Sequence, residues 1–343
     1  MGRRRGRPWP VLAAVGVVAV ALFTWSLAVV AGPTGRRSIS VLCSSIETLC
    51  QQWALGFTRR SGIEVIMVRL PTGEALARLS RPASAGEFDV WHGGPSDMYE
   101  VARSRGLLAP YLSPEVDAVA ADLRDLDGWW TGIYLGVLGF CSNQRLLDEL
   151  GLDVPRSWDD LLAPELRDRV SVPSPVTSGT GYTWLSTQVQ RLGGEQAALA
   201  YARQLDTKVL QYTNSGLAPA GVVGRGEAVV AVTFTQHCVQ AADAGMSDLV
   251  VSYPHEGTGF EIGAVAVLAH AADPDAAHAY VDWAISGEAQ AAGPGAVAVQ
   301  LPTRDDVPAD ARLTGGALLI SHPDLDPGLR DRLVDAFQAQ VHR

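Results

Sequence analysis

The sequence lacks the short motifs that carry much of enzyme chemistry. It contains no G-x-S-x-G nucleophile elbow and no phosphate-binding loop of the form G-x-x-x-x-G-K-[ST]. It has no C-x-x-C pair and no histidine-rich spacing that would indicate a metal site. These absences favour a binding protein over a hydrolase or transferase. We therefore expect no enzyme activity, no cofactor and no resident metal.

Positive charge is scarce in the body of the chain. The 343 residues carry a formal net charge of −10, and six arginines lie in residues 1–37, which contain no acid. Without that segment the formal charge is −16. A body this acidic argues against nucleic acid as a partner. A site for an anion must then be local and built from backbone donors.

Cysteine is sparse, with four residues at Cys43, Cys50, Cys141 and Cys238. An even number in an exported chain permits disulfides, and four cysteines allow three pairings. We expect Cys43 to pair with Cys50, seven residues away across a strand end and a helix start. Cys141 and Cys238 each follow a β-like run and are expected to form the second pair. Four buried free thiols are the alternative.

The N-terminal segment indicates where the protein works. A cluster of arginines at residues 3–7 precedes residues 11–31, a run of 21 residues without a charge. The run is long enough to span a bilayer, so residues 1–37 are either a signal peptide or a membrane anchor. Arginines before the run place the body outside the cytoplasm. No cysteine ends the run, which argues against a lipoprotein.

The length and an apolar content of 47% fit about two globular domains. Strand-like runs alternate with helix-like runs from residue 38 to residue 105, which predicts an α/β fold with a parallel sheet. In such sheets the ligand crevice lies at the carboxyl ends of the strands. Ser44 and Ser45 follow the first expected strand, and Gly94 and Ser96 follow the third. These four residues are therefore candidate ligand contacts.

A second candidate lies in residues 171–192, where a β-branched run leads through the loop TSGTG into an apolar helical pattern. The first N–H groups of a helix have no partner within it and carry the positive end of its dipole. Small side chains at Ser178, Gly179 and Thr180 let a phosphate, phosphonate or carboxylate approach those donors. The alternative is an ordinary helix cap.

Two further loops resemble this arrangement. Residues 213–216 are expected to open another helix, with Asn214 and Ser215 as candidate donors. Thr235 and Gln236 stand at the carboxyl end of a buried strand expected over residues 228–234. A helix is also expected to start at Ser157, with an acid three residues later. Lone histidines are given no catalytic role.

From residue 38 to the C-terminus, the order of these pieces resembles the solute-binding proteins of ATP-driven (ABC) importers, which have the type II periplasmic-binding-protein fold. The resemblance rests on five runs: residues 155–166 (PRSWDDLLAPEL), 175–180 (PVTSGT), 213–227, 254–264 (PHEGTGFEIGA) and 272–290. It implies a two-lobed α/β fold with the ligand cleft between the lobes.

The same resemblance implies the division of the chain and its partners. Residues 38–133 and 262–343 are expected to form lobe 1, and residues 134–261 lobe 2. The protein is expected to be an extracytoplasmic monomer that closes on a small anionic solute and docks on an ABC permease. A membrane-tethered ligand sensor of the same fold is an alternative.

Members of this group bind ferric iron, hexose phosphates or 2-aminoethylphosphonate. The iron binders place two adjacent tyrosines after the strand equivalent to residues 228–234, because phenolate oxygens are hard ligands for Fe³⁺. Here that place reads TFTQH from residue 233. We therefore favour an organic phosphate or phosphonate, with a ferric-iron binder as the alternative. Glu256 and Glu261 would answer an amine or sugar hydroxyls on the ligand, and solvated loop acids are the other interpretation.

The candidate ligand-binding residues are Ser44, Ser45, Gly94, Ser96, Ser178, Gly179, Thr180, Asn214, Ser215, Thr235, Gln236, Glu256 and Glu261.

Overall fold

A computed structural model of the protein describes residues 2, 37–291, 300–314 and 327–341. Residues 39–343 belong to one compact unit. The uncharged run over residues 11–31, expected to be a signal or anchor, lies outside the described residues. Within the described residues, no helix combines the length and the apolar character that crossing a membrane requires.

A single sheet of ten strands runs through the described part of this unit. Its main path is β2 (Glu64–Arg69), β1 (Ser38–Cys43), β3 (Val90–Pro95), β10 (Phe260–Leu268), β5 (Thr131–Asn143), β8 (Val230–Phe234), β6 (Val170–Pro173) and β7 (Val209–Thr213). Two further strands lie off this path: β4 (Leu108–Ala109) pairs with β10, and β9 (Leu249–Ser252) pairs with β5.

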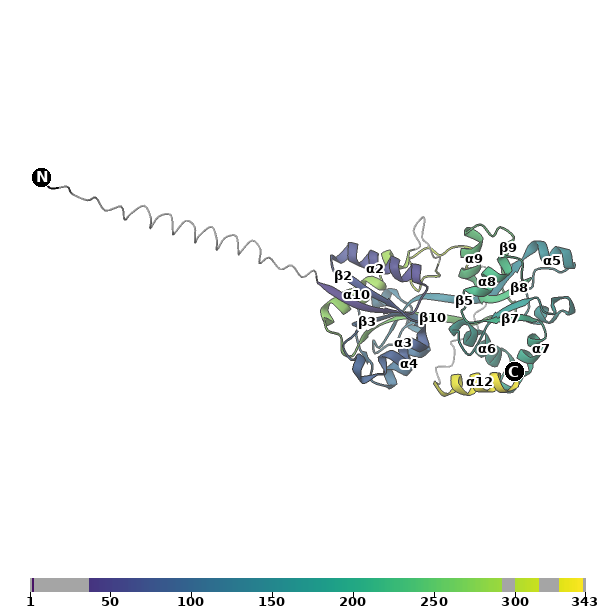
Figure 1. Ribbon diagram of the computed structural model, residues 1–343, viewed down its shortest axis with the longest axis horizontal. Coiled ribbons are helices and arrows are strands. Elements are labelled where there is room, and N and C mark those ends of the chain that lie inside the picture. The colour runs from purple at the N-terminus through teal and green to yellow at the C-terminus, as the bar shows by residue number, and fades with distance from the viewer. Residues whose placement is uncertain (1, 3–36, 292–299, 315–326, 342–343) are drawn as a thin grey trace. The chain divides into compact units, whose positions relative to one another are not determined.

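Strands β5 and β10 connect the two halves of the sheet, which we call lobe 1 (around β1 and β3) and lobe 2 (around β6 and β8). The first part of β5 pairs antiparallel with β10, and the second part pairs with β8 and β9. Figure 1 shows β5 and β10 passing from one group of helices to the other. Strand β5 has 13 residues and is therefore long enough to belong to both halves.

Helices alternate with the strands, as expected for an α/β chain. They are α2 (Glu47–Ser61), α3 (Thr72–Leu79), α4 (Ser96–Ser104), α5 (Gln144–Leu150), α6 (Gly179–Leu192), α7 (Glu195–Asp206), α8 (Ala218–Gly224), α9 (Thr235–Asp243), α10 (Pro274–Ala284), α11 (Gly287–Gln290) and α12 (Pro327–Gln340). Strand β1 runs parallel to β3, and β6 runs parallel to β7 and β8. The carboxyl ends of these strands therefore meet at one edge in each lobe.

Each lobe has its own aromatic core. In lobe 1, Phe57 of α2 packs against Tyr280 of α10, with ring centroids 5.0 Å apart. In lobe 2, Trp184 of α6 lies 6.1 Å from Phe337, which belongs to α12. Burial of a phenylalanine side chain contributes roughly 1.5–3 kcal/mol. The C-terminal helix is thus held on lobe 2, whereas residues 262–343 were expected in lobe 1.

Both expected disulfides are confirmed. Cys43 at the end of β1 pairs with Cys50 in α2, and Cys141 in β5 pairs with Cys238 in α9. All four cysteines are therefore paired. Each disulfide ties a helix to the strand that comes before it or beside it.

The helix expected to start at Ser157 is only a 3₁₀ turn over Asp159–Leu162. The carboxylate of Asp160 does reach back, accepting the backbone N–H groups of Arg156 at 2.8 Å and Ser157 at 2.9 Å. Pro164 then stops the turn, because a residue before proline is disfavoured in the α-helical region. The contact of Asp160 with the start of the turn is present, but the prediction of a helix was wrong.

The helix expected to open at residues 213–216 starts later. α8 begins at Ala218, with Leu217 as its N-cap and a proline in the first turn. Proline is preferred there because its fixed φ suits a helix and its missing N–H is not needed. Asn214 and Ser215 therefore lie in the loop before the helix and do not occupy its start.

Candidate ligand-binding site

In lobe 1 the residues after β1 pack directly on the end of β3. This strand runs to Pro95, so Gly94 lies within it instead of following it, and Ser96 begins α4. Gly94 has a φ of 80°, and a Cβ there would lie 3.1 Å from the Cβ of Ser44 and 2.7 Å from the hydroxyl of Thr72. Glycine is required for both reasons, since it adopts positive φ and leaves room for the neighbouring loop. The indole N–H of Trp91 donates to Ser44 Oγ at 2.9 Å. The predicted neighbours Ser44 and Gly94 are thus brought together.

Tyr134 of β5 forms hydrogen bonds with both of these segments. Its hydroxyl accepts the N–H of Gly94 at 3.1 Å and exchanges a hydrogen bond with the side chain of Ser45. Burial raises the pKa of Tyr134, and the charge of Glu261 raises it further, so the phenol stays protonated.

In lobe 2 the start of α6 is capped as one alternative predicted. Ser178 Oγ accepts the N–H of Gly181 at 3.3 Å. A Cβ on Gly179 would lie 3.5 Å from Glu261 Oε2 and 3.8 Å from Pro95, which belongs to lobe 1. The first turn of α6 therefore faces the other lobe.

The loop at Gly216 lies against this first turn. A Cβ on Gly216 would lie 2.0 Å from the hydroxyl of Thr180. The Gly216 carbonyl accepts a hydrogen bond from Thr233 Oγ1 at 2.6 Å and lies 3.1 Å from His237 Nδ1. A carbonyl only accepts, so Nδ1 of His237 carries the proton and Nε2 presents a lone pair.

His237 borders a cavity of about 410 Å³ between the lobes. Lobe 1 contributes Ile46 and Thr48 at the start of α2, and lobe 2 contributes the beginning of α8 and one face of α9. Burial lowers the pKa of His237 to about 4, although the hydrogen bond with Gly216 opposes the shift. The imidazole is therefore neutral at pH 7 and acts as an acceptor.

Glu261 of β10 sits beside the first turn of α6 in a space of about 10 Å³, about enough for one water molecule. Its side chain is buried, and Ser96 and Gly179 line the same space. Burial and, to a smaller extent, the charge of Asp97 raise the pKa of Glu261 to about 8, against the opposing charge of Arg330. At pH 7 the carboxyl is largely protonated and can donate as well as accept.

The other predicted residues lie in different surroundings. Glu256 accepts hydrogen bonds from the hydroxyl of Ser157 and the backbone N–H of Trp158, which fastens the 155–158 loop. The Thr235 hydroxyl donates to the Val137 carbonyl at 3.3 Å.

Three predicted residues remain near the lobe-2 loops. Asn214 and Ser215 are exposed, and Asn214 Oδ1 lies 3.4 Å from the hydroxyl of Thr177. Gln236 is buried in the first turn of α9. The structure thus groups Ser44, Ser45 and Gly94 in lobe 1, and it places Gly179 opposite Glu261 and Thr180 against Gly216.

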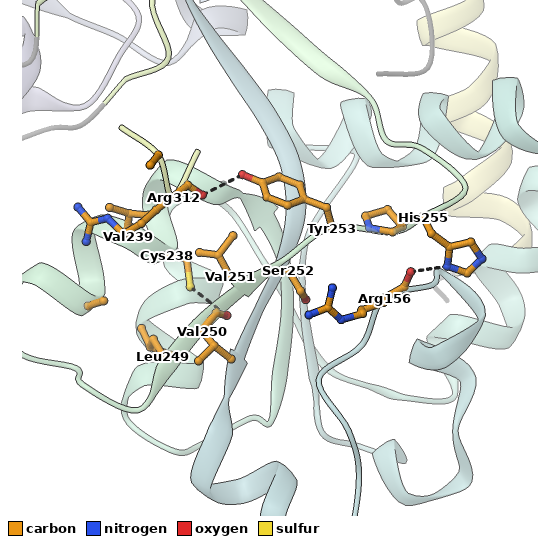
Figure 2. A pocket seen from close by; sticks show the side chains of 13 residues that line it. Arg156, Cys238, Val239, Leu249, Val250, Val251, Ser252, Tyr253, His255 and Arg312 are labelled. Atoms are coloured by element: carbon orange, nitrogen blue, oxygen red, sulfur yellow. Dashed lines mark hydrogen bonds between the residues drawn. The ribbon is translucent and has the colours of Figure 1, made fainter. Parts of the chain in front are cut away.

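A separate hollow of about 570 Å³ lies on lobe 2 beside β9. Figure 2 shows its lining, with the Tyr253 hydroxyl directed at the Arg312 carbonyl at 3.2 Å and the His255 ring 2.7 Å from the Arg156 carbonyl. None of the candidate residues borders this hollow. We therefore place the candidate site between the lobes.

Sequence reasoning missed the roles of His237, Tyr134 and Arg330. The available signal for His237 was its place three residues after the end of β8, next to residues already chosen. Tyr134 and Arg330 approach the site from positions distant in the chain, which a short motif does not reveal.

Two lobes joined by crossing strands, with the first turn of α6 in lobe 2 facing the end of β3 in lobe 1, have the architecture of a two-lobed binding protein. Residues 95–318 match the family described as bacterial extracellular solute-binding protein, and the chain belongs to that family.

An uncharacterized protein of Haemophilus influenzae is 34% identical over 279 residues, covering 80% of each chain. An Fe(3+)-binding periplasmic protein of Serratia marcescens is 26% identical, covering 74% of this chain and 75% of that protein. The structure of the periplasmic binding protein AfuA from Actinobacillus pleuropneumoniae, with fructose 6-phosphate bound, superposes with a TM-score of 0.81 at 29% identity, covering 90% of this chain and 99% of that one. These matches confirm the type II periplasmic-binding-protein fold, and the Serratia and Actinobacillus proteins are named as binding proteins.

Proposed function

We propose that this protein is the extracytoplasmic solute-binding component of an ABC importer, and that it captures a small organic phosphate or phosphonate between its lobes. The observation that carries the proposal is that the first turn of α6 in lobe 2 faces the end of β3 in lobe 1, where a Cβ on Gly179 would lie 3.8 Å from Pro95. Lobe 1 offers the Ser44–Ser45 loop beside Gly94, and lobe 2 offers the first turn of α6. The loaded protein would deliver its solute to a membrane permease.

The first turn of α6 offers hydrogen-bond donors to an anionic group. Its N–H groups carry the positive end of the helix dipole. The space beside Gly179 holds only about 10 Å³, so the lobes must part there to admit a phosphate. The body of the chain has a formal charge of −16, so long-range attraction does not bring an anion in. Affinity then depends on preformed local donors and on closure of the lobes.

The remainder of the ligand is expected to carry hydrogen-bond donors. His237 presents a neutral acceptor to the cavity between the lobes, and Glu261 offers a carboxyl beside the first turn of α6. Sugar hydroxyls or an amine would satisfy both groups. The fructose 6-phosphate bound to the similar AfuA protein supports a ligand of this kind.

Ferric iron is the less favoured ligand. One relative is named as an Fe(3+)-binding protein, but the strand β8 is followed here by Thr235 and Gln236 at the start of α9. These side chains are poor ligands for a hard trivalent ion compared with phenolates.

Calorimetric titration and thermal melting of the full-length protein test the proposal. The panel is fructose 6-phosphate, glucose 6-phosphate, 2-aminoethylphosphonate, inorganic phosphate, unphosphorylated fructose and ferric citrate. We expect at least one organic phosphate or phosphonate to bind and raise the melting temperature, since a ligand at 100 times its Kd stabilises by about 2.7 kcal/mol. A response to ferric citrate alone would overturn the ligand assignment.

A pair of histidine variants locates the site. We expect His237→Leu to weaken binding of the responding ligand about tenfold or more, because a buried ligand donor loses its acceptor. His255→Leu is the matched control, since His255 is exposed and lines the separate hollow on lobe 2. Equal affinities for the two variants would place the ligand elsewhere.

A further inference from the structure

The C-terminal helix α12 is fixed to lobe 2 by apolar contacts. Leu333 and Phe337 are fully buried in the lobe-2 core, and the Phe337 ring lies 5.6 Å from that of Tyr212. Figure 1 shows α12 beside α6 and α7. The helix lies beyond residues 95–318, the segment that matches the family. Its position is therefore a property of this chain that the family match does not describe.

One side chain of α12 reaches the other lobe. Arg330 Nη1 lies 3.1 Å from Asp97 Oδ2, and Asp97 belongs to the first turn of α4 in lobe 1. The same guanidinium lies over the ring of Tyr182 in α6, 4.5 Å from its centroid. Arg330 is thus held by lobe 2 on one side and pairs with lobe 1 on the other.

This ion pair is only partly accessible to water. The side chains of Arg330 and Asp97 are 22% and 15% exposed. Both residues line the small space that contains Glu261 and Gly179. Asp97 Oδ1 is buried, and among the described residues it has no hydrogen-bond partner. A protonated Glu261 carboxyl, or a water in the shared space, would satisfy that oxygen.

We propose that α12 is an interlobe clasp, in which Arg330, anchored on lobe 2, holds Asp97 of lobe 1 and so favours the conformation in which the lobes meet around Glu261. Asp97 and Arg330 act as positioning residues that need not touch the ligand. The clasp rests on the proposed function, because it sets how readily the lobes part and how long a captured solute stays. The effect of the clasp on the separation of the lobes does not require a ligand.

The size of the effect follows from the partial burial of the pair. Exposed ion pairs contribute little, whereas breaking a pair that is shielded from water leaves a charge without compensation. For this pair we expect a shift of about three- to tenfold in the ratio of closed to open protein, with the same factor in ligand affinity.

Four variants of the full-length protein test the clasp. Arg330→Ala and Asp97→Asn remove it from either side, and the double variant Asp97→Arg with Arg330→Asp restores the pair with exchanged charges. Arg332→Ala is the matched control, because Arg332 is on the same helix and its ion pair, 3.6 Å to Glu195, stays within lobe 2.

Two measurements are made on each variant. Small-angle scattering without ligand reports the separation of the lobes, and stopped-flow dissociation of fructose 6-phosphate reports how long the solute is held. We expect both single clasp variants to have a larger radius of gyration and faster dissociation than Arg332→Ala. The exchanged pair is expected to recover part of each change.

Scattering curves for Arg330→Ala and Asp97→Asn that match Arg332→Ala would overturn the clasp. Asp97→Asn keeps the side-chain volume and decides the question if Arg330→Ala does not fold. Failure of fructose 6-phosphate to bind any form would count against the ligand assignment, and the scattering comparison would still decide the clasp.

Discussion

Replacing Glu261 by glutamine is expected to change how the stability of the protein depends on pH. Burial raises the pKa of Glu261 from 4.5 to about 8. Four groups face it: Asp97 on α4 and Arg330 on α12, with Tyr134 of β5 and Tyr99 of α4 at longer range. Glutamine keeps nearly the same shape and removes the titration.

The direction follows from proton binding. Between pH 4.5 and about 8 the folded protein keeps a proton on Glu261 that the unfolded chain has released. Stability falls with pH wherever the folded state binds more protons, by about 1.4 kcal/mol per pH unit for one proton. The contribution of Glu261 is fully present below pH 4.5 and is lost as pH rises to about 8. By pH 7 the loss is roughly 3 kcal/mol.

Urea unfolding of ligand-free protein at pH 5, 6, 7 and 8 measures this contribution. We expect the stability of Glu261→Gln relative to the wild type to increase with each step to higher pH. Glu256→Gln is the control. Burial alone would raise the pKa of Glu256, but the hydrogen bond from Ser157 and other contacts lower it on balance, so it stays ionised over this range. Parallel stability curves for the wild type and Glu261→Gln between pH 5 and 8 would refute the reasoning.

Two further substitutions probe the first turn of α6. Ser178→Ala removes its cap and should lower the free energy of unfolding by about 1 kcal/mol, measured by urea titration, and an unchanged midpoint would speak against the cap. Gly216→Ala places a methyl group 2.0 Å from the Thr180 hydroxyl. This substitution should lower the free energy of unfolding by about 1–3 kcal/mol and weaken ligand binding measured by calorimetry. Wild-type values for both quantities would show that the loop shifts to accept the methyl group without cost.

Local patterns in the sequence predicted most of the helices and strands. Helix α3 has the bounds that its threonine start and apolar spacing predict, and Ser178 caps α6 as expected. The alternation of strands and helices gave the α/β class because each element carries its own period of apolar residues. Two helix boundaries were predicted wrongly, and a proline lies at each. Pro164 limited one expected helix to a 3₁₀ turn, and Pro219 set the start of α8.

The candidate site was predicted only in part, for reasons of distance along the chain. Ser44 and Gly94 follow neighbouring parallel strands, so their proximity follows from the sheet. Glu256 looked like Glu261 in sequence, but the partners that distinguish them, Ser157 and Asp97, come from remote segments. The docking of α12 on lobe 2 likewise depends on Phe337 finding a place among side chains more than 100 residues away, at Trp184 and Tyr212.

The two disulfides bear on the order in which the protein matures. Cys43 and Cys50 are separated by seven residues, whereas Cys141 and Cys238 are separated by 97. The first bond can close as soon as a short stretch of chain meets an oxidant, but the second must wait until lobe 2 has emerged almost whole. Closing a loop of about 100 residues removes about 4.7 kcal/mol of conformational freedom from the unfolded chain, which is more than closing a short loop removes. A chain held in a reducing compartment would therefore lose most stability in lobe 2, which carries the second disulfide.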